Sequence, residues 1–192
     1  MYGSMPTSEQ EEQRISLELF QKIRPICVRL TELILTNEDV SGSSKRIQSL
    51  KDLSTVLTEF FSTKGDGISI ALNLADYIFF PISQFLGKNA TSDSELDHCL
   101  YIVNSIATHC WTKPGHLNTK LFEQLISLVS VLIGGAPNNV DISGHSEEVI
   151  QNGVSCIKHL MIGCQNQADG FETAFSRKKI FQSILAHTIS VL

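Results

Sequence analysis

The chain has 192 residues, of which 42% are hydrophobic and 18% are charged, and its formal net charge is -5 at pH 7. These values are typical of a folded domain and exclude an intrinsically disordered chain. The acidic balance argues against general nucleic-acid binding. Even the apolar stretch at residues 126–133 is too short for a membrane span of ~20 residues, and the polar, acidic residues 8–14 do not resemble a signal peptide.

The first predicted helix covers Glu9 to Thr36. Apolar residues recur along it every three or four positions, which is the pattern of one buried helix face. Pro25 falls inside this stretch, and proline cannot donate a backbone hydrogen bond, so we expect either a kink or a second segment that begins near it. The predicted buried face consists of Ile15, Leu19, Ile23, Ile26, Cys27, Leu30, Leu33 and Ile34.

The second predicted helix follows a polar loop at residues 37–44 and ends near Phe61. Ser43 or Ser44 is its expected N-cap, because a serine hydroxyl can accept a hydrogen bond from a free N–H group at the helix start. Its predicted buried face consists of Ile47, Leu50, Leu53, Leu57, Phe60 and Phe61.

The third predicted helix runs from Ser69 to Leu86, after a turn at residues 62–67. It is apolar enough to be buried on more than one side. Pro81 predicts a kink or a break near Phe80. The predicted buried residues are Leu72, Leu74, Ala75, Ile78, Phe79, Ile82 and Phe85.

Residues 92–134 predict an antiparallel pair of helices, the first capped by Asp93 or Ser94. The first helix should end at residues 113–115, where a proline and a glycine interrupt the pattern, and the second at the two glycines 134–135. The predicted buried faces are Leu96, Cys99, Leu100, Val103, Ile106, Ala107 and Cys110 in the first helix, and Leu121, Leu125, Leu128, Val129 and Leu132 in the second.

Two further helices are predicted after the irregular residues 136–145. Ser146, followed by two glutamates, indicates a capped helix that continues to Gly163. The last helix begins at Ser176 and has no stop signal before Leu192, so we expect the natural protein to continue. The predicted apolar positions are Ile150, Val154, Ile157, Leu160 and Met161 in the first of these helices, and Ile180, Phe181, Ile184, Leu185, Ile189 and Leu192 in the second.

The helices can be grouped into pairs near residues 44–86, 92–134 and 146–192. The unit therefore recurs about every fifty residues, close to the ~40–47 residues of armadillo and HEAT repeats. The sequence predicts an all-α fold with about seven helices, arranged as an α-solenoid of HEAT-like antiparallel hairpins over residues 9–192. A compact helical bundle is the alternative. Residues 1–8 are predicted to be a cloning scar and a flexible N-terminus.

The cysteines predict free thiols. Their odd number and scattered spacing do not suit a disulfide framework, and they lie mostly within apolar helical patterns. Buried free thiols are typical of a reducing compartment, so we expect a cytosolic or nuclear protein. The cysteines are Cys27, Cys99, Cys110, Cys156 and Cys164.

Cys156, His159 and Cys164 are the closest approach to a metal motif, because the first two have ligand-like spacing on a helix. A zinc site needs about four N or S ligands, and the adjacent His-Cys pairs at 98–99 and 109–110 point in different directions on a helix. We therefore predict core thiols and boundary histidines, with no metal site, no cofactor and no catalytic residue.

Three stretches resemble a known family. Residues 20–31 (FQKIRPICVRLT) are similar to the N-terminal "LRPVCVQLT" helix of the TELO-interacting protein one family, which supplies the largest subunit of the Triple T cochaperone complex. Residues 50–57 match a second amphipathic helix of the family. Residues 75–82 (ADYIFFPI) are similar to its "QQYILFPL" segment.

The resemblance implies a non-catalytic HEAT-repeat scaffold that supports the stability and assembly of phosphatidylinositol-3-kinase-related kinases with the Hsp-ninety system. The implied partners are the other Triple T subunits, kinases such as the target-of-rapamycin kinase, and the Hsp-ninety machinery, with no nucleic acid and no membrane. The implied location is the cytoplasm and also the nucleus. We interpret the motif residues Pro25, Cys27, Phe80 and Pro81 as structural.

The fold alone also fits a second function, a helical-repeat adaptor in transport or trafficking. An enzyme is a third class, and it requires a pocket with converging polar groups that the sequence does not display. The scaffold is favoured because no catalytic constellation accompanies the repeat.

Overall fold

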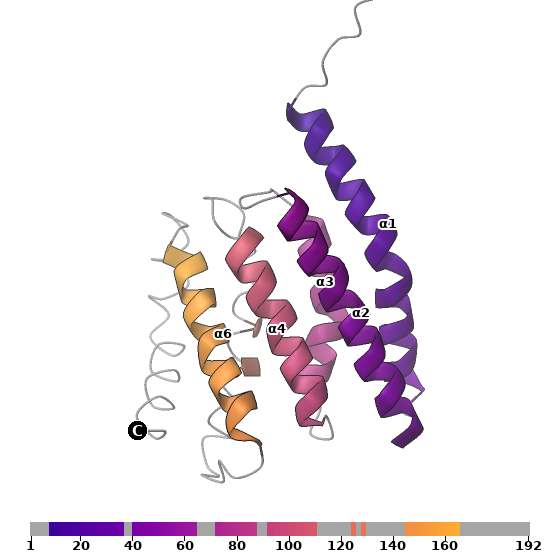
Figure 1. Cartoon of the computed structure of the whole chain (residues 1–192), viewed down its shortest axis with the longest axis vertical. Helices are drawn as coiled ribbons and strands as arrows, with labels where there is room; N and C mark the ends of the chain where they lie inside the picture. The colour runs from indigo at the N-terminus through magenta and orange to yellow at the C-terminus, as the bar shows by residue number, and fades with distance from the viewer. Residues whose placement is uncertain are drawn as a thin grey trace, which may run out of the picture.

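A computed structural model describes the chain over residues 8–36, 40–64, 72–87, 92–110, 124–125, 128–129 and 145–165. Every regular element in these ranges is an α-helix (Figure 1). The helices are α1 (Ser8–Leu35), α2 (Val40–Lys64), α3 (Leu72–Leu86), α4 (Asp93–Cys110) and α6 (Glu147–Gln165).

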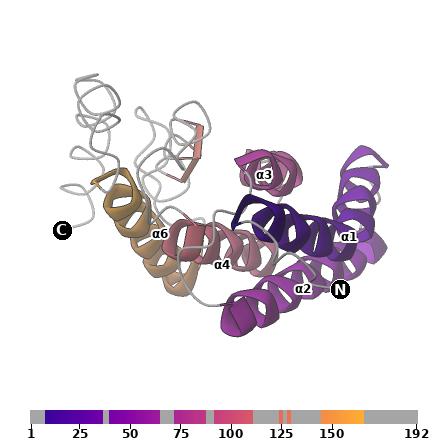
Figure 2. The same cartoon turned by 90° about the horizontal axis from the view of Figure 1, so that it is seen from above.

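The helices are arranged in a row with a second layer beside it. α4 lies between α2 and α6, and the three are seen side by side in Figure 1. α1 packs on both α2 and α3, and α3 also packs on α4. Figure 2 shows α3 on one side of the row that α4 and α6 form.

Contacts between α2 and α4 show that these two helices run parallel. Arg46, near the start of α2, donates from Nε to Glu95 Oε1 near the start of α4 over 2.5 Å. Further along, the hydroxyl groups of Thr58 and Tyr101 are 2.9 Å apart. Parallel neighbours need a returning segment between them, and α3 lies between them in the chain.

Contacts between α4 and α6 repeat this geometry. Asn152 donates a hydrogen bond to Asp97 Oδ1, and His159 Nδ1 lies 3.2 Å from Asn104 Oδ1. The partners in each pair are 55 residues apart in sequence, close to the predicted period. Parallel helices that recur at this interval form an α-solenoid, as predicted, because each repeat packs on its neighbours along the row.

The predicted buried faces are confirmed over most of the described positions. The side chains of the core cluster come from each of the described helices α1, α2, α3, α4 and α6, and they include the buried Leu125 and Val129. Some of the predicted core residues are only half-buried, namely Ile15, Leu33, Ile47, Leu128, Ile150 and Ile157. Val154 is exposed, so its assignment to the apolar face of α6 was wrong. An exposed valine is ordinary on a protein surface, which is more than half apolar.

Neither proline interrupts its helix. α1 continues through Pro25 and α3 through Pro81, so the predicted second segment at Pro25 and the predicted break near Phe80 are wrong. Pro25 is exposed, and the carbonyl that loses its helical N–H partner there can bind water instead. Pro81 is buried between core residues, where apolar packing offsets the lost hydrogen bond.

Two of the predicted N-caps were also wrong. α2 begins at Val40, so Ser43 and Ser44 lie inside the helix. α4 is capped by Ser92, whose backbone N donates to Glu95 Oε2 over 2.8 Å while its own Oγ accepts from Glu95 N over 3.4 Å. This reciprocal pair is a capping box.

Asp93 does not cap α4, because its carboxylate contacts the start of α6. Its Oδ1 lies 2.9 Å from His145 Nδ1, and its Oδ2 accepts from Ser146 N over 2.6 Å. These contacts, led by the hydrogen bond to His145, hold the pKa of Asp93 below its ordinary value. Asp93 therefore joins neighbouring repeats at their N-terminal ends.

Ser146 was correctly predicted as the cap of α6. Its Oγ lies 3.4 Å from Val149 N, the free donor at the third helical position. We expect Ser146→Ala to lower the free energy of unfolding by ~1 kcal/mol, and Ser146→Gly by only a few tenths of that, because glycine is tolerated at this position. Urea unfolding at pH 7 measures the free energy of unfolding of both variants. Equal destabilisation by the two substitutions would contradict the capping role.

The remaining predictions fall on residues that the structure does not describe. These include the loop at 136–145 except His145, the helix end at 113–115 and the last helix from Ser176.

Candidate partner-binding surface

The thiols that the structure describes are buried and free, as predicted for Cys27, Cys99 and Cys156. Burial raises the pKa of Cys27 to about 12 and raises the pKa values of Cys99 and Cys156 as well. A thiol whose pKa is raised in this way carries almost no nucleophilic thiolate at neutral pH. The side chains of Cys110 and Cys164 lie outside the described residues.

The candidate metal ligands whose side chains the structure describes do not converge. His159 is paired with Asn104 rather than with Cys156, and His109 stacks on Phe61 with ring centroids 4.6 Å apart. Among the described residues, no three His, Cys, Asp or Glu side chains lie close enough together to hold a metal ion.

The two main motif segments come together on α1 and α3. The rings of Phe20 and Tyr77 meet edge to face, with centroids 5.4 Å apart and planes at 65°. Burial, with a smaller contribution from Cys27, raises the pKa of Tyr77, and the nearby Arg24 opposes the shift. The segments that carry the resemblance are therefore neighbours in space.

Phe80 corrects the structural interpretation of the second motif. Its side chain is 58% exposed, whereas the adjacent Pro81 and Phe79 are buried. Cys27 is buried, as a structural residue should be, and Pro25 is exposed. The physical reason is the helix period: Phe79 and Phe80 point about 100° apart, so only one of them can face the core.

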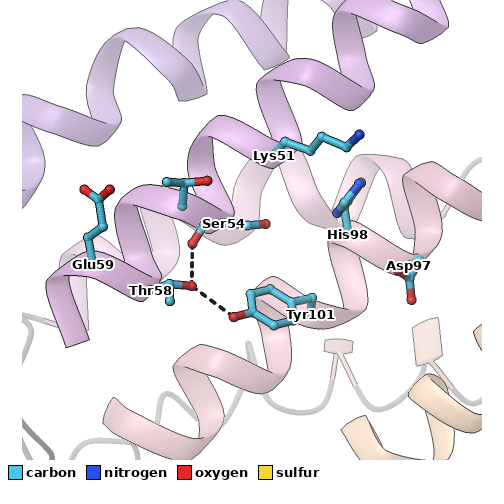
Figure 3. A pocket seen from close by; sticks show the side chains of 8 residues that line it. Lys51, Ser54, Thr58, Glu59, Asp97, His98 and Tyr101 are labelled. Carbon is cyan, nitrogen blue, oxygen red and sulfur yellow. Dashed lines mark hydrogen bonds between the residues drawn. The ribbon is translucent and has the colours of Figure 1, made fainter. Parts of the chain in front are cut away.

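A groove of about 490 Å³ lies between α2 and α4, within the range of ligand-binding clefts. Figure 3 shows Lys51 and His98 at one end of the groove and Glu59 toward the other, with Tyr101 between them. Its other lining residues are Ser54, Thr55, Thr58 and Asp97. The walls are mostly side chains that can hydrogen-bond.

The lysine end of the groove carries charges of both signs, because Asp97 lines it together with Lys51 and His98 (Figure 3). Burial lowers the pKa of His98; the adjacent Asp97 opposes this shift, and Lys51 adds a smaller lowering effect. Within the described residues, Lys51 forms no ion pair with an acidic side chain.

Comparison with known proteins identifies the family. The model of the TTI1 N-terminal TPR domain matches residues 20–192. The chain belongs to this family. It is also similar to TEL2-interacting protein 1 of Saccharomyces cerevisiae, with 24% identity over 175 residues, which cover 90% of this chain and 16% of that protein. The chain thus spans about a sixth of the length of that relative. No solved structure matches the chain.

The family assignment agrees with the solenoid and confirms the resemblance seen in the sequence. The family description names TPR repeats, which have ~34 residues per unit, whereas contacting positions of α4 and α6 are 55 residues apart. Both repeat types stack helical hairpins into extended binding surfaces. None of the described helices is long and apolar enough to cross a membrane.

Sequence reasoning missed the groove. Lys51 and Tyr101 were not singled out, and His98 was considered only as part of a His-Cys pair, because the groove arises where two helices whose contacting residues are 43 to 49 positions apart run side by side. Tyr101 offered the one available signal. It is a large side chain outside the apolar face of its helix, and it is 47% exposed in the structure.

Proposed function

We propose that this chain is a non-catalytic, partner-binding part of a TEL2-interacting protein. In this role it supports the stability and assembly of phosphatidylinositol-3-kinase-related kinases as part of the Triple T cochaperone complex, together with the Hsp-ninety system. The observation that carries the proposal is the family match over residues 20–192. The name of the yeast relative, a TEL2-interacting protein, supports a TEL2-type subunit as one direct partner.

The architecture supports a scaffold role. Parallel helices in a row give an elongated surface on which several proteins can bind at once. Exposed Phe80 and Tyr101 are residue types that contribute to protein contacts. The described cysteine thiols are buried, which supports a non-catalytic role. A cytoplasmic or nuclear location is part of the same proposal.

The test is affinity purification from cells, comparing the full-length parent protein with a version that lacks residues 5–192. We expect the intact protein to recover a TEL2-type subunit and the large kinases, and the deletion to lose at least one of them. Mass spectrometry identifies the lost partner. A parent protein that recovers transport factors instead would establish the adaptor function, and one that recovers neither set would refute the proposed complex.

A further inference from the structure

We propose that the outer face of α1 and α3 binds a helix of a protein partner. The bound helix brings an acidic side chain to Arg24 and an apolar side chain to either side of it. The proposal rests on the protein-binding function above and adds the surface and the chemistry of the partner. The outer face consists of the exposed residues Leu17, Arg24 and Val28 on α1 and Phe80 on α3.

On α1, the outer face is a stripe of exposed side chains. Leu17, Val28 and Leu35 are the exposed large apolar residues of the described part of α1. Positions 17, 24, 28 and 35 are separated by seven or four residues, close to a whole number of helical turns, so their side chains lie on one side of the helix. The core face of α1 lies on the other side. Exposed apolar residues that gather in this way mark an interaction surface.

Phe80 extends the outer face onto α3. The rings of Phe20 and Tyr77 join α1 and α3, with centroids 5.4 Å apart. Arg24 lies one turn after Phe20, and Phe80 lies one turn after Tyr77. The two helices run in the same direction, because each is joined by a short connection to one of the parallel helices α2 and α4. Arg24 and Phe80 are therefore level with each other beside the ring contact, and both residue types are enriched at protein interfaces.

Arg24 supplies a positive charge that has no acidic partner within the described residues. The other basic side chains of α1 form ion pairs, Arg14 with Glu11, Lys22 with Glu18 and Arg29 with Asp52. Burial raises the pKa of Tyr77 and Arg24 opposes this rise, so the guanidinium lies close to the ring contact. The other exposed residues of the stripe are uncharged. An acidic side chain of a partner complements this charge.

Asp76 does not cancel the charge of Arg24. It lies one turn before Phe80, but Asp76 and Tyr77 point ~100° apart, and Tyr77 is the residue that faces α1. Asp76 also has an interaction of its own. A second copy of this chain is a poorer occupant, because pairing the same face of two copies would offer each Arg24 no carboxylate. The charge therefore favours a different protein.

The spacing of the stripe defines the bound helix. Leu17 and Val28 are 11 positions apart on α1, or ~16 Å at ~1.5 Å per residue, and Arg24 is seven positions from one and four from the other. A helix packed alongside α1 meets these residues with side chains at i and i+11 and a third at i+4 or i+7, according to its direction. The partner segment is therefore an amphipathic helix with an acidic residue between two apolar ones.

The probe is the alanine-rich helical peptide acetyl-AALAKAEAAEAKALAA-amide, which places a glutamate opposite Arg24 in either direction. It is titrated into the ¹⁵N-labelled 192-residue chain, and backbone amide shifts are recorded. We expect saturable shifts at residues 17–28 and 77–84 with a Kd of ~1 mM or below. The glutamine peptide acetyl-AALAKAQAAQAKALAA-amide should bind at least ~5-fold more weakly. General attraction to a chain of net charge -5 would give the opposite order, because the glutamine peptide is more positive.

Charge reversal locates the contact. Arg24→Glu should weaken binding of the glutamate peptide ~10-fold or more and strengthen binding of the lysine peptide acetyl-AALAKAKAAKAKALAA-amide. Lys22→Glu is the matched control, because it changes the charge equally on the same helix while Lys22 points ~160° away from Arg24. It loses only an exposed ion pair and should leave both affinities within about twofold. Circular dichroism checks that both variants remain folded.

Phe80→Ala tests the apolar part of the face. It should weaken binding of the glutamate peptide ~5-fold or more, because it removes the exposed ring beside Arg24. Val154→Ala is the control, because Val154 is an exposed apolar residue on α6, and it should leave the affinity unchanged.

Three results would overturn the proposal: equal binding of the glutamate and glutamine peptides, equal effects of Arg24→Glu and Lys22→Glu, or shifts confined to other helices. None of them depends on recovery of the complex from cells. Loss of peptide binding with intact co-purification would therefore reject the outer face and leave the scaffold function standing. The reverse pattern would reject the complex alone.

Discussion

Replacing Phe79 with alanine is expected to lower the free energy of unfolding by about 3–5 kcal/mol. The Phe79 side chain is fully buried and is among the largest in the core. Its removal takes away apolar contacts and leaves a cavity that the packed neighbours can fill only in part. A loss of this size is a large share of the total stability of a typical domain.

The adjacent Phe80→Ala is the matched control, since it makes the same chemical change on the same helix one position away. Because Phe80 is 58% exposed, we expect its replacement to change stability by no more than about 1 kcal/mol. Urea unfolding followed by circular dichroism measures both variants. Similar losses for the two would mean that α3 does not present Phe79 to the core.

The helical repeat could be predicted from the sequence because burial follows the helix period. Leu50, Leu53 and Leu57, for example, recur at three and four positions and are all fully buried. The residues of a helix that are buried recur every three or four positions in the sequence, whichever residues they contact in space. Consecutive helices joined by short connections then limit the fold to stacked hairpins or a bundle.

The helix boundaries were harder to predict because they depend on contacts made elsewhere. Asp93 looks like a cap for α4, but its carboxylate contacts His145 and Ser146, which are 52 and 53 residues away. Pro25 and Pro81 resemble breaks, but the helices that contain them are stabilised by packing on their neighbours. Local propensity cannot include these tertiary contributions.

The groove was the least predictable feature. Lys51 and His98 become neighbours only because α2 and α4 run parallel, and nothing in either helix alone indicates the register between them. The motif segments around Arg24 and Tyr77 also meet through packing, between α1 and α3. The sequence resemblance located these segments without revealing that Phe80 would be exposed.

The second large effect is expected from Glu95, whose side chain is only 1% exposed and joins two repeats. One carboxylate oxygen accepts from Arg46 on α2, and the other accepts from the Ser92 backbone N and hydroxyl at the start of α4. We expect Glu95→Ala to lower the free energy of unfolding by about 3–5 kcal/mol, because it deprives the largely buried Arg46 of its counter-charge and removes half of the capping box.

Two control variants separate the effect of burying this ion pair from the effect of its charge. Glu95→Gln keeps an oxygen that can accept from the Ser92 N–H group, so its loss should be smaller than that of Glu95→Ala. Arg14→Ala breaks an ion pair with Glu11 on the exposed surface of α1, where solvent screens the charges, and should destabilise the fold far less than Glu95→Ala. If Glu95→Ala cost no more than Arg14→Ala, the contact between Arg46 and Glu95 would contribute little to the packing of the two repeats.

The same carboxylate predicts how stability depends on pH. Burial alone raises the pKa of Glu95, but the hydrogen bonds from Arg46 and Ser92 outweigh it and hold the pKa below its ordinary value of 4.5. A carboxyl whose pKa is lower in the folded state stabilises the fold above the unfolded pKa, and this contribution is lost as pH falls through the folded value. We therefore expect the midpoint urea concentration of the unmodified chain to decrease as the pH is lowered below 4.5. The Glu95→Gln variant should show a smaller decrease over the same pH range. Parallel pH profiles for the two proteins would mean that other carboxylates cause the acid sensitivity.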